Sequence, residues 1–328
     1  MKEIKLGIIG TNFVSDWLAD CAAEVSGIAV TAVYSRKAET GDAFAAKHAI
    51  PNVYTDMEAF LSSEIDAVYI ASPNAFHFAQ AEAAMHHGKH VLLEKPAALT
   101  EADFVRLAQI AEEEHVVLIE AMRPAHDPVM LKAKEMLPEL GRLRRAVFEF
   151  CQYSSRYDRF KAGETLNAFD PKFGNAAVMD IGVYAIHSCV MMLGAPDSVE
   201  ADSFVFDNGM EGSGTAKLKY GDMTAEIVYS KIHESVTPSY ITGERGSIVI
   251  GKLSTGENLS LKMRKEQPVP FTADERDGTR PEWNMVYEIE DFVRAVNGER
   301  GTADFSENTR ITMRVIDEIR RQNGIKFE

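Results

Sequence analysis

Hydrophobic residues in the first third of the chain fall in short runs, separated by stretches with helical spacing. The runs predict buried strands, namely Ile4–Ile9, Ile28–Tyr34, Ala67–Ala71, His90–Leu93 and Val116–Ile119. The stretches between them predict helices, at Val14–Val25, Lys37–His48, Ala75–His87 and after an N-cap at Thr100. Such alternation is typical of a parallel sheet covered on both faces. We therefore expect an α/β domain with a doubly wound sheet over residues 1–122.

The pattern changes after Arg123-Pro124. A long strand at Leu143–Cys151 and a helix at Ala176–Leu193 precede several short strands, at Thr215–Tyr220, Met223–Tyr229, Tyr240–Thr242, Ser247–Ile250 and Leu259–Met263. Gly221-Asp222 predicts a tight hairpin between the first two of these short strands. Helices at Met285–Val296 and Glu307–Gln322 end the chain. This predicts an α+β domain over residues 123–328, with a mainly antiparallel open sheet and a last helix able to pack back on the first domain.

Composition excludes several classes of partner. The formal net charge of -15 argues against a nucleic acid or an anionic membrane surface. Cys21, Cys151 and Cys189 form no CxxC pair, so we expect buried thiols in a reducing cytoplasm and no metal site. We see no signal peptide and no apolar run near the ~20 residues of a membrane helix. We expect a cytoplasmic protein.

The loop after the first strand has the position of a dinucleotide-binding fingerprint. A helix N-terminus there presents N–H groups to a pyrophosphate, so Gly10, Thr11, Asn12 and Phe13 are candidate cofactor-binding residues. Only Gly10 fits G-x-G-x-x-G, because Asn12 and Ser15 replace the other two glycines. Asn tolerates positive φ and Ser is small, which makes both replacements plausible. The alternative is an ordinary strand–turn–helix.

The second strand ends in Ser35, Arg36 and Lys37. An NAD site usually has a carboxylate here to bind the ribose 2′-OH. A hydroxyl and two cations suit a 2′-phosphate instead, so we predict NADP or NAD with NADP favoured. The alternative is a solvated turn with incidental charges.

Two later loops lie at the carboxyl edge of the predicted sheet, where ligands bind. One carries Ser72, Asn74 and His77, and the other carries Glu94 and Lys95. We predict that these residues lie along the cofactor. The alternatives are an N-cap role for Asn74, a packed His77 and a structural Glu94–Lys95 pair.

Asp180, Tyr184 and His187 follow the spacing i, i+4, i+7, which places them on one face of the predicted helix. Buried polar groups need partners, so this stripe favours a functional role over an incidental one. A loop spanning Tyr153–Asp170 is rich in aromatic and cationic residues. Tyr153 is a candidate substrate-binding residue there, unless the loop is only a solvated surface.

These segments together resemble the Gfo/Idh/MocA oxidoreductase family, named after glucose–fructose oxidoreductase, inositol dehydrogenase and a rhizopine-catabolism protein. The similarity runs from end to end, through GIIGTNFVS, ASPNAFH, GKHVLLEKPAALT, MDIGVYAIH, DFVRAVNG and VIDEIRRQNG. Its most specific element is Glu94-Lys95-Pro96 combined with Asp180 and Tyr184. The Asp180/Tyr184 pair looks more like the dihydrodiol and D-xylose dehydrogenase branch of the family than the inositol branch. Asn12, Ser15 and Asn175 depart from the family's glycines.

The resemblance implies a Rossmann domain followed by a substrate-binding and oligomerisation domain. It also implies that Lys95 is the catalytic lysine, that Asp180 and Tyr184 are its partners, and that His187 is close enough to bind substrate. An ammonium near Tyr184 would favour the phenolate, which can take the hydroxyl proton of an alcohol. The cofactor would supply the hydride chemistry.

We therefore expect an NAD(P)-dependent oxidoreductase acting on the CH–OH group of a sugar, polyol or related diol or carbonyl compound. The alternatives are an NAD-dependent glycoside-cleaving enzyme of the same fold and a non-catalytic dinucleotide-sensing regulator. Lys95 and Tyr184 speak against a regulator, and the missing carboxylate after the second strand speaks mildly against glycoside cleavage. Ala216, Leu218 and Tyr220 alternate with polar residues, and with the family resemblance this favours a homo-oligomer through the C-terminal sheet.

Overall fold

The computed structural model describes residues 3–271 and 282–327, and these form two compact units. The described part of the first unit is 3–123 and 282–307, and that of the second is 124–271 and 308–327. The chain therefore returns to the first unit with α10 (Met285–Val296), which packs on α1 (Phe13–Ala22). Most of α11 (Ala303–Asn323) belongs to the second unit. The returning helix is thus the penultimate one, and the packing of the last helix on the first domain stays a prediction.

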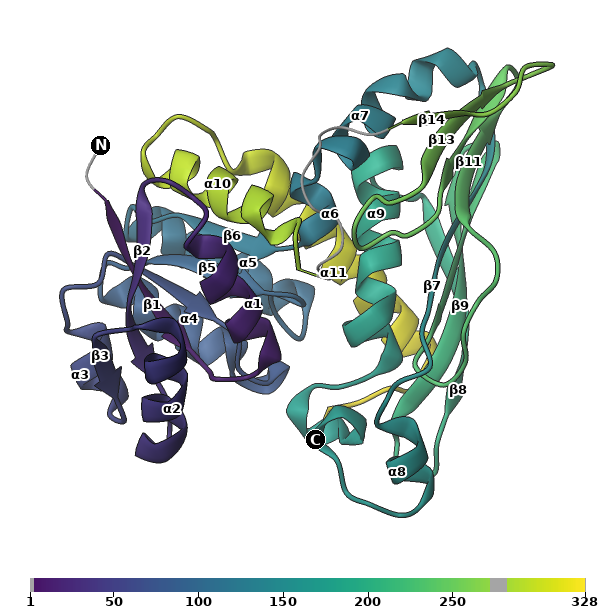
Figure 1. The fold of residues 1–328 in the computed structure, drawn as a ribbon. Helices are drawn as coiled ribbons and strands as arrows, with labels where there is room; N and C mark the ends of the chain where they lie inside the picture. The colour runs from purple at the N-terminus through teal and green to yellow at the C-terminus, as the bar shows by residue number, and fades with distance from the viewer. Residues whose placement is uncertain (1–2, 272–281, 328) are drawn as a thin grey trace. The chain divides into compact units, whose positions relative to one another are not determined.

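The first unit is built on a six-stranded parallel sheet in the order β3-β2-β1-β4-β5-β6. Its strands are β1 (Ile4–Ile9), β2 (Ile28–Tyr34), β3 (Asn52–Tyr54), β4 (Ala67–Ile70), β5 (His90–Glu94) and β6 (Leu118–Ala121). Besides α1, the helices are α2 (Ala38–His48), α3 (Met57–Leu61), α4 (His77–His86) and α5 (Glu101–Glu113), as Figure 1 shows. The strand order reverses between β1 and β4, which is where such sheets bind ligands. The predicted doubly wound sheet is confirmed.

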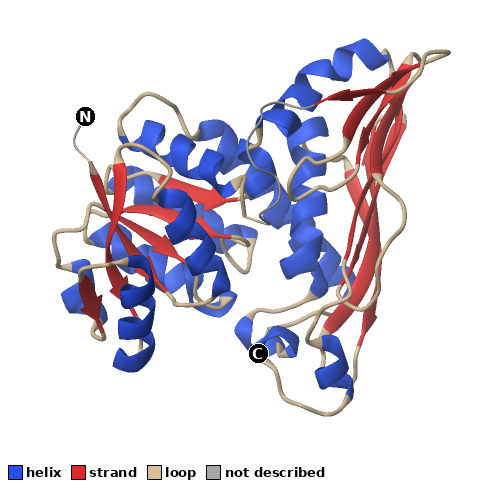
Figure 2. Cartoon of the chain, in the orientation of Figure 1, coloured by secondary structure: helices blue, strands red, loops and turns tan. Residues whose placement is uncertain are grey.

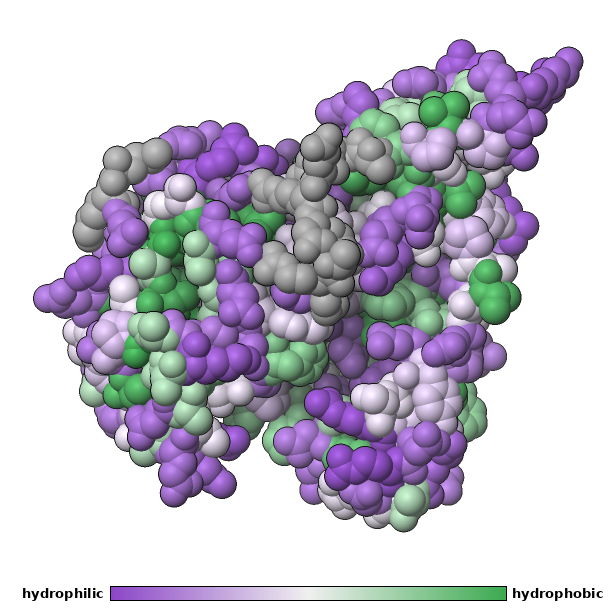
Figure 3. Space-filling model, viewed as in Figure 1, coloured by the Kyte–Doolittle hydropathy of each residue, from purple (hydrophilic) through white to green (hydrophobic). Residues whose placement is uncertain are grey.

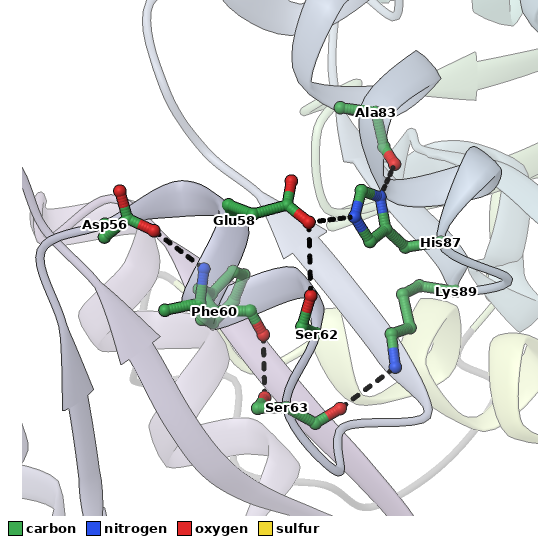
Figure 4. Close-up of polar contacts among 9 residues, drawn as sticks. Asp56, Glu58, Phe60, Ser62, Ser63, Ala83, His87 and Lys89 are labelled. Atoms are coloured by element: carbon green, nitrogen blue, oxygen red, sulfur yellow. Dashed lines mark hydrogen bonds and ion pairs between the residues drawn. The ribbon is translucent and has the colours of Figure 1, made fainter.

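Two short elements of the first unit, β3 and α3, were not predicted from the sequence. Both are too short to show a period, and α3 combines two buried residues, Phe60 and Leu61, with the polar contacts of Figure 4. Asp56 accepts the backbone N–H of Ala59 at 2.8 Å as the N-cap. Glu58 contacts His87 Nε2 at 3.1 Å, which joins α3 to the end of α4. The predicted N-cap at Thr100 is confirmed, because its hydroxyl accepts Asp103 N at 3.1 Å.

The second unit is built on an eight-stranded sheet in the order β14-β13-β12-β11-β7-β10-β9-β8. Its strands are β7 (Leu143–Cys151), β8 (Ser198–Val205), β9 (Glu211–Tyr220), β10 (Met223–Ser230), β11 (Ser239–Gly243), β12 (Gly246–Ile250), β13 (Leu259–Met263) and β14 (Val269–Phe271). The β7–β10 pair is parallel and the other described pairs are antiparallel. Tyr220 pairs with Met223 across the predicted hairpin. The mainly antiparallel sheet is confirmed.

Helices cover one face of this sheet (Figure 2). α9 (Val183–Leu193) packs on β7 and β10, and α7 (Pro128–Met136) and most of α11 belong to the same unit. α6 (Arg123–His126) lies at the boundary of the two units in sequence, and α8 (Tyr157–Lys161) lies in the loop after β7. Along β9, Ala216 and Leu218 are buried whereas Lys217 and Lys219 are exposed, as the alternation predicted. Polar residues also dominate much of the surface in the view of Figure 3.

The predicted helix Ala176–Leu193 has two parts. Val178–Gly182 form a π-helix, and α9 follows directly. The segment Pro171–Leu193 is long and apolar enough to cross a membrane, but 78% of its most apolar window is buried. Such burial is typical of the core helix of a globular unit.

Candidate active site

Gly10 directly follows β1 in a conformation that favours glycine. Its φ is +108°, and a Cβ there would lie 2.9 Å from the carbonyl oxygen of Ala71, which follows β4. Both facts disfavour any side chain at this position. The glycine therefore lets the loops after β1 and β4 approach closely at the point where the strand order reverses.

Asn12 closes the same turn as the N-cap of α1. Its Oδ1 accepts the backbone N–H groups of Val14 and Ser15 at 2.8 and 3.2 Å, and its Nδ2 donates to Ala71 O at 2.6 Å. Its φ of -91° is ordinary extended backbone, so the expectation that Asn12 replaces a glycine through positive φ is wrong. Ser15 is fully buried, which agrees with the need for a small residue.

Thr11 and Phe13 flank Asn12 at the start of α1. Thr11 is half-buried, and the Phe13 ring is 53% exposed and packs edge-on to Trp17 with ring centroids 4.9 Å apart. The helix N-terminus supplies backbone N–H groups and a positive dipole end. A glycine that allows close approach, next to a capped helix start, fits the pyrophosphate of a dinucleotide.

In the turn after β2, Ser35 points inward, whereas Arg36 and Lys37 are exposed. Ser35 is buried, and its Oγ lies 2.6 Å from Thr40 Oγ1 and accepts Lys37 N at 3.4 Å. Its hydroxyl is therefore used within the turn, and a direct cofactor contact by that hydroxyl is not supported. Arg36 and Lys37 are exposed, and no ion pair joins either of them to another residue that the structure describes. This leaves two cations available for an anionic group such as a 2′-phosphate.

His77 joins the loops after β4 and β5. It is buried, with Nδ1 2.9 Å from Pro96 O and Nε2 2.9 Å from Ser72 O. Burial lowers the pKa of His77, so the ring is neutral and donates to one carbonyl at a time. Both nitrogens face backbone carbonyl groups, as the alternative of a packed His77 expected, and a cofactor contact by His77 stays a prediction. His77 thereby positions the two loops.

Ser72 and Asn74 occupy the turn before α4. Ser72 Oγ donates to Gln80 Oε1 at 2.7 Å. Asn74 begins a 3₁₀ turn that spans Asn74–Phe76, and the N-cap position of α4 is Phe76. The alternative of Asn74 as the cap of α4 is therefore wrong. A cofactor contact by Asn74 stays a prediction.

Glu94 ends β5 and binds the backbone of the residue that follows it. Its Oε1 accepts Tyr69 OH at 2.5 Å, and its Oε2 accepts the backbone N–H of Lys95 at 3.2 Å. Burial raises the pKa of Glu94, against the opposing effect of the Lys95 and Arg123 charges. Glu94 thus orients the loop that carries Lys95.

Glu288 on α10 is a further ionisable group of this region that the sequence did not indicate. It is fully buried, and within the described chain neither carboxyl oxygen has a hydrogen-bond partner. Burial, and then the charge of Glu94, raise the pKa of Glu288 well above its ordinary value, while Arg123 acts the other way. Arg123 in turn donates from Nε to Asn284 Oδ1 at 2.6 Å. Glu288 lies far from Glu94 in sequence, so no motif could reveal this neighbour.

Asp180 lies in the π-helix of the second unit and pairs with an unexpected lysine. Its Oδ2 is 2.9 Å from Lys231 Nζ, and the Lys231 side chain is only 3% exposed. Tyr184 is half-buried, and its ring packs edge-on to Phe150 with centroids 5.3 Å apart. Lys231 follows β10, and sequence analysis overlooked it because nothing near it in sequence marks a site.

His187 differs from Asp180 and Tyr184 although it shares their helix stripe. It is 1% exposed, and burial together with repulsion from His126 lowers its pKa to about 3. A ring held neutral in this way cannot gain a proton at neutral pH. His187 is therefore a core residue, and its predicted contact with substrate is not supported.

Tyr153 is engaged within its own loop. Its hydroxyl donates to Asp158 Oδ1 at 2.6 Å and accepts from Lys161 Nζ at 2.8 Å. A direct substrate contact by Tyr153 stays a prediction. Farther along this loop, Phe160 and Phe169 stack with centroids 4.8 Å apart and border a cavity of about 690 Å³ in the second unit. Among the residues that the structure describes, no cluster of His, Cys, Asp or Glu could hold a metal ion.

Known proteins match this chain over nearly its full length. The model of the oxidoreductase family with an NAD-binding Rossmann fold matches residues 4–122, and that of the GFO/IDH/MocA C-terminal domain matches residues 130–249. The scyllo-inositol 2-dehydrogenase (NADP(+)) IolU of Bacillus subtilis (strain 168) is 38% identical over 99% of this chain and 98% of its own. The chain belongs to the Gfo/Idh/MocA family of oxidoreductases. The predicted family, the oxidoreductase activity and the nicotinamide dinucleotide cofactor are confirmed.

Two other matches extend this result. D-xylose 1-dehydrogenase (NADP(+)) 2 of Haloferax volcanii is 29% identical over 95% of each chain. The structure of KijD10, a 3-ketoreductase from Actinomadura kijaniata in complex with NADP, superposes with a TM-score of 0.81 at 22% identity, covering 98% of each chain. The inositol dehydrogenase is thus more similar overall than the xylose enzyme, although the Asp180/Tyr184 motif favours the branch of the latter.

Proposed function

We propose that this Gfo/Idh/MocA oxidoreductase is an NADP-preferring dehydrogenase or reductase of a polyol or sugar, with a cyclic polyol such as an inositol as the first candidate. The observation that carries the cofactor preference is the exposed Arg36–Lys37 pair, which has no ion-pair partner among the described residues. The relative at 38% identity, named an NADP(+)-dependent scyllo-inositol dehydrogenase, supports both parts of the proposal.

The turn after β2 favours NADP by charge. Two exposed cations would attract the 2′-phosphate, whereas none of Ser35, Arg36 and Lys37 offers a carboxylate acceptor for the 2′-OH of NAD. Ser35 supports the turn from inside through Thr40 and the backbone of Lys37. Arg36 can bind the phosphate with two parallel N–H groups, so we expect it to contribute more than Lys37.

For proton transfer we propose Lys95, Tyr184 and Asp180. When bound, the nicotinamide would supply the hydride chemistry. Tyr184 exchanges the proton of the substrate hydroxyl, Lys95 stabilises negative charge on oxygen, and Asp180 orients the other two groups. Glu94 supports this by holding the backbone N–H of Lys95.

The test is a kinetic screen with the purified enzyme. Reduced cofactor would be followed by absorbance with inositols, sugars and their carbonyl counterparts, using NADP and NAD in parallel. We expect a higher kcat/KM with NADP, and we expect Arg36→Ala to lower it about tenfold or more while leaving the NAD value unchanged.

Arg106→Ala is the matched control for this screen. Arg106 is an exposed arginine on α5 of the same unit and pairs with Glu113 at 3.3 Å. It should leave both cofactor constants unchanged. A wild-type preference for NAD that Arg36→Ala does not alter would contradict the cofactor proposal, and no turnover of any polyol or sugar would contradict the substrate proposal.

We further propose a homo-oligomer built on the open face of the eight-stranded sheet. On that face Glu226 pairs with Arg145 at 3.0 Å and lies opposite Lys217, while Phe204 is 51% exposed. A large apolar ring within a polar face is common in protein interfaces. Light scattering should give a multiple of 36.3 kDa, and Phe204→Glu should shift it toward the monomer. A wild-type monomer at micromolar concentration would contradict this.

A cytoplasmic location remains part of the proposal. The three cysteines are free, with Cys21 and Cys189 buried and Cys151 half-buried, as suits a reducing compartment. Fractionation of the producing cells should recover the protein with soluble cytoplasmic markers. Recovery with secreted or membrane fractions would contradict this location.

A further inference from the structure

A buried lysine directly after β10 contacts two segments of the second unit at once. The Nζ of Lys231 lies 2.9 Å from Asp180 Oδ2 and donates to the carbonyl oxygen of Ala168 at 2.8 Å. It also lies 5.0 Å from the centroid of the Phe169 ring. A buried ammonium is costly unless it is paired, so these contacts fix its position. Lys231 therefore links the π-helix to the segment before it.

The backbone of Lys231 is fixed as firmly as its side chain. Its N–H donates to Gly212 O on β9 at 2.9 Å. The neighbouring Glu211 is fully buried and accepts the backbone N–H of Val178, the first residue of the π-helix, at 2.7 Å. Glu211 and Lys231, which are neighbours in the fold, thus both bind the five-residue π-helix. π-helical turns are rare and often mark functional sites.

We propose that Lys231 is a positioning residue for the reaction, which acts by fixing the direction of the Asp180 carboxylate. This inference rests on the proposed function, because it assigns Asp180 to the proton-transfer group. The Lys231 ammonium pairs with Oδ2 of the Asp180 carboxylate, which leaves Oδ1 for other contacts. Lys231 acts through Asp180, and for this reason it is not counted as a catalytic residue.

The same lysine couples Asp180 to a short turn that borders a cavity of the second unit. Ala168 and Phe169 lie in one 3₁₀ turn, Asn167–Phe169, and the Phe169 ring packs below the ammonium. Phe169 and Phe160 border the cavity of about 690 Å³. Loss of the ammonium would release the carboxylate and this turn together. We therefore expect an effect on turnover and on the KM of the polyol, and none on the KM of the cofactor.

The first experiment compares substitutions at this position. Lys231→Met keeps a flexible apolar chain and removes the charge. It should lower kcat/KM for the polyol about 10²-fold, as expected for a misplaced catalytic group. Lys231→Arg retains a cation and should recover most of that loss. Lys262→Met, at an exposed lysine of β13, is the matched control and should behave like the wild type.

The second experiment needs no substrate. Hydrogen–deuterium exchange of the cofactor-free protein should be faster in peptides spanning 166–182 for Lys231→Met than for the wild type, with Lys231→Arg close to the wild type. Lys231→Gln, which keeps a donor for Ala168 O without the charge, takes the place of Lys231→Met if that variant does not fold. It should show the same kinetic loss.

These experiments distinguish a failure of the proposed function from a failure of the role proposed for Lys231. If the wild type turns over no polyol or sugar, the proposed function fails, and the exchange data alone decide whether Lys231 positions the segment. Wild-type kinetics and wild-type exchange in the uncharged variants would overturn the role of Lys231. An equal loss in the Arg and uncharged variants, or a raised cofactor KM, would also overturn it.

Discussion

The start of α1 and the start of α9 both carry candidate site residues, and they are built in different ways. At α1 the turn is held by its own residues, because Gly10 allows the close approach and Asn12 caps the helix two and three residues on. At the π-helix that leads into α9 the supports come from later strands, since Glu211 binds Val178 and Lys231 binds Asp180. A site held locally can be found from sequence, whereas a site held by distant residues needs the fold.

The strongest test of the local turn is Gly10→Ala. The positive φ and the contact with Ala71 O should lower the free energy of unfolding by about 3 kcal/mol or force the loop to move. We expect the Kd for NADP to rise about 10²-fold, measured by fluorescence titration. Gly88→Ala is the control, because Gly88 has a φ of +68° but no atom within 4 Å of the added Cβ. It should cost about 1 kcal/mol and leave the Kd unchanged. Unchanged binding in Gly10→Ala would break the local half of the comparison.

The corresponding test of the distant support is Glu211→Leu. It removes the acceptor of Val178 N, Ser203 Oγ and Tyr229 OH, which lie at 2.7, 2.7 and 2.8 Å. Leaving these donors unpaired should lower the free energy of unfolding by about 3 kcal/mol in urea titrations. Glu211→Gln keeps an amide oxygen and should cost less. Equal stability of the Leu variant and the wild type would show that α9 does not depend on this strand.

Glu288 shows that the first unit also depends on a residue far away in sequence, because its charge state is linked to that of Glu94. Burial raises the pKa of Glu288, so the native state binds more protons than the unfolded chain above the ordinary carboxyl pKa. The wild type should therefore lose about 1.4 kcal/mol of stability per pH unit as the pH rises through the window between the unfolded and the raised folded pKa.

Glu288→Gln removes this loss. In thermal unfolding, the variant should gain on the wild type as the pH rises and match it below the ordinary carboxyl pKa. Glu299→Gln, at an exposed position of the same unit, is the control and should show no such trend. A constant difference between Glu288→Gln and the wild type at all pH values would contradict the neutral, buried state of Glu288.

The smallest expected effect concerns the cap. Asn12→Ala should cost about 1 kcal/mol in thermal unfolding, because two helix N–H groups lose their acceptor. Asn12→Asp keeps that acceptor but loses the donor to Ala71 O, which lies at 2.6 Å, and it adds negative charge near the expected pyrophosphate. It should stay more stable than the Ala variant and still bind NADP more weakly. The reverse order of stabilities would show that the link to Ala71 outweighs the cap.

Sequence reasoning succeeded where a pattern is carried by neighbouring residues. The strands of the parallel sheet, the Tyr220–Met223 hairpin and α10 follow from periodicity and turn chemistry. It failed where tertiary packing decides. His187 shares a helix stripe with Tyr184 but is buried, and the π-helix at Val178–Gly182 has no local signal.

The supports of the site escaped prediction for the same reason. Arg123 and Glu288 are near Glu94 only in the folded first unit, and Lys231 is near Asp180 only because β10 lies beside β7 and β9. Ser35 and His77 were named correctly as residues of the sheet edge, but their side chains turn inward to hold the loops. The sequence therefore locates the loops better than it assigns their side chains.

The central claim is that the chain is an NADP-dependent oxidoreductase whose proton transfer depends on Lys95 and Tyr184 together. The most direct test measures kcat with NADP and the best polyol for the wild type, Lys95→Met, Tyr184→Phe and the double variant. Each single change should lower kcat by about 10²–10⁴-fold, and the double change should cost little more, because the groups act as a unit. The Kd for NADP should stay near the wild-type value in all four. Wild-type kcat in both single variants would contradict the account.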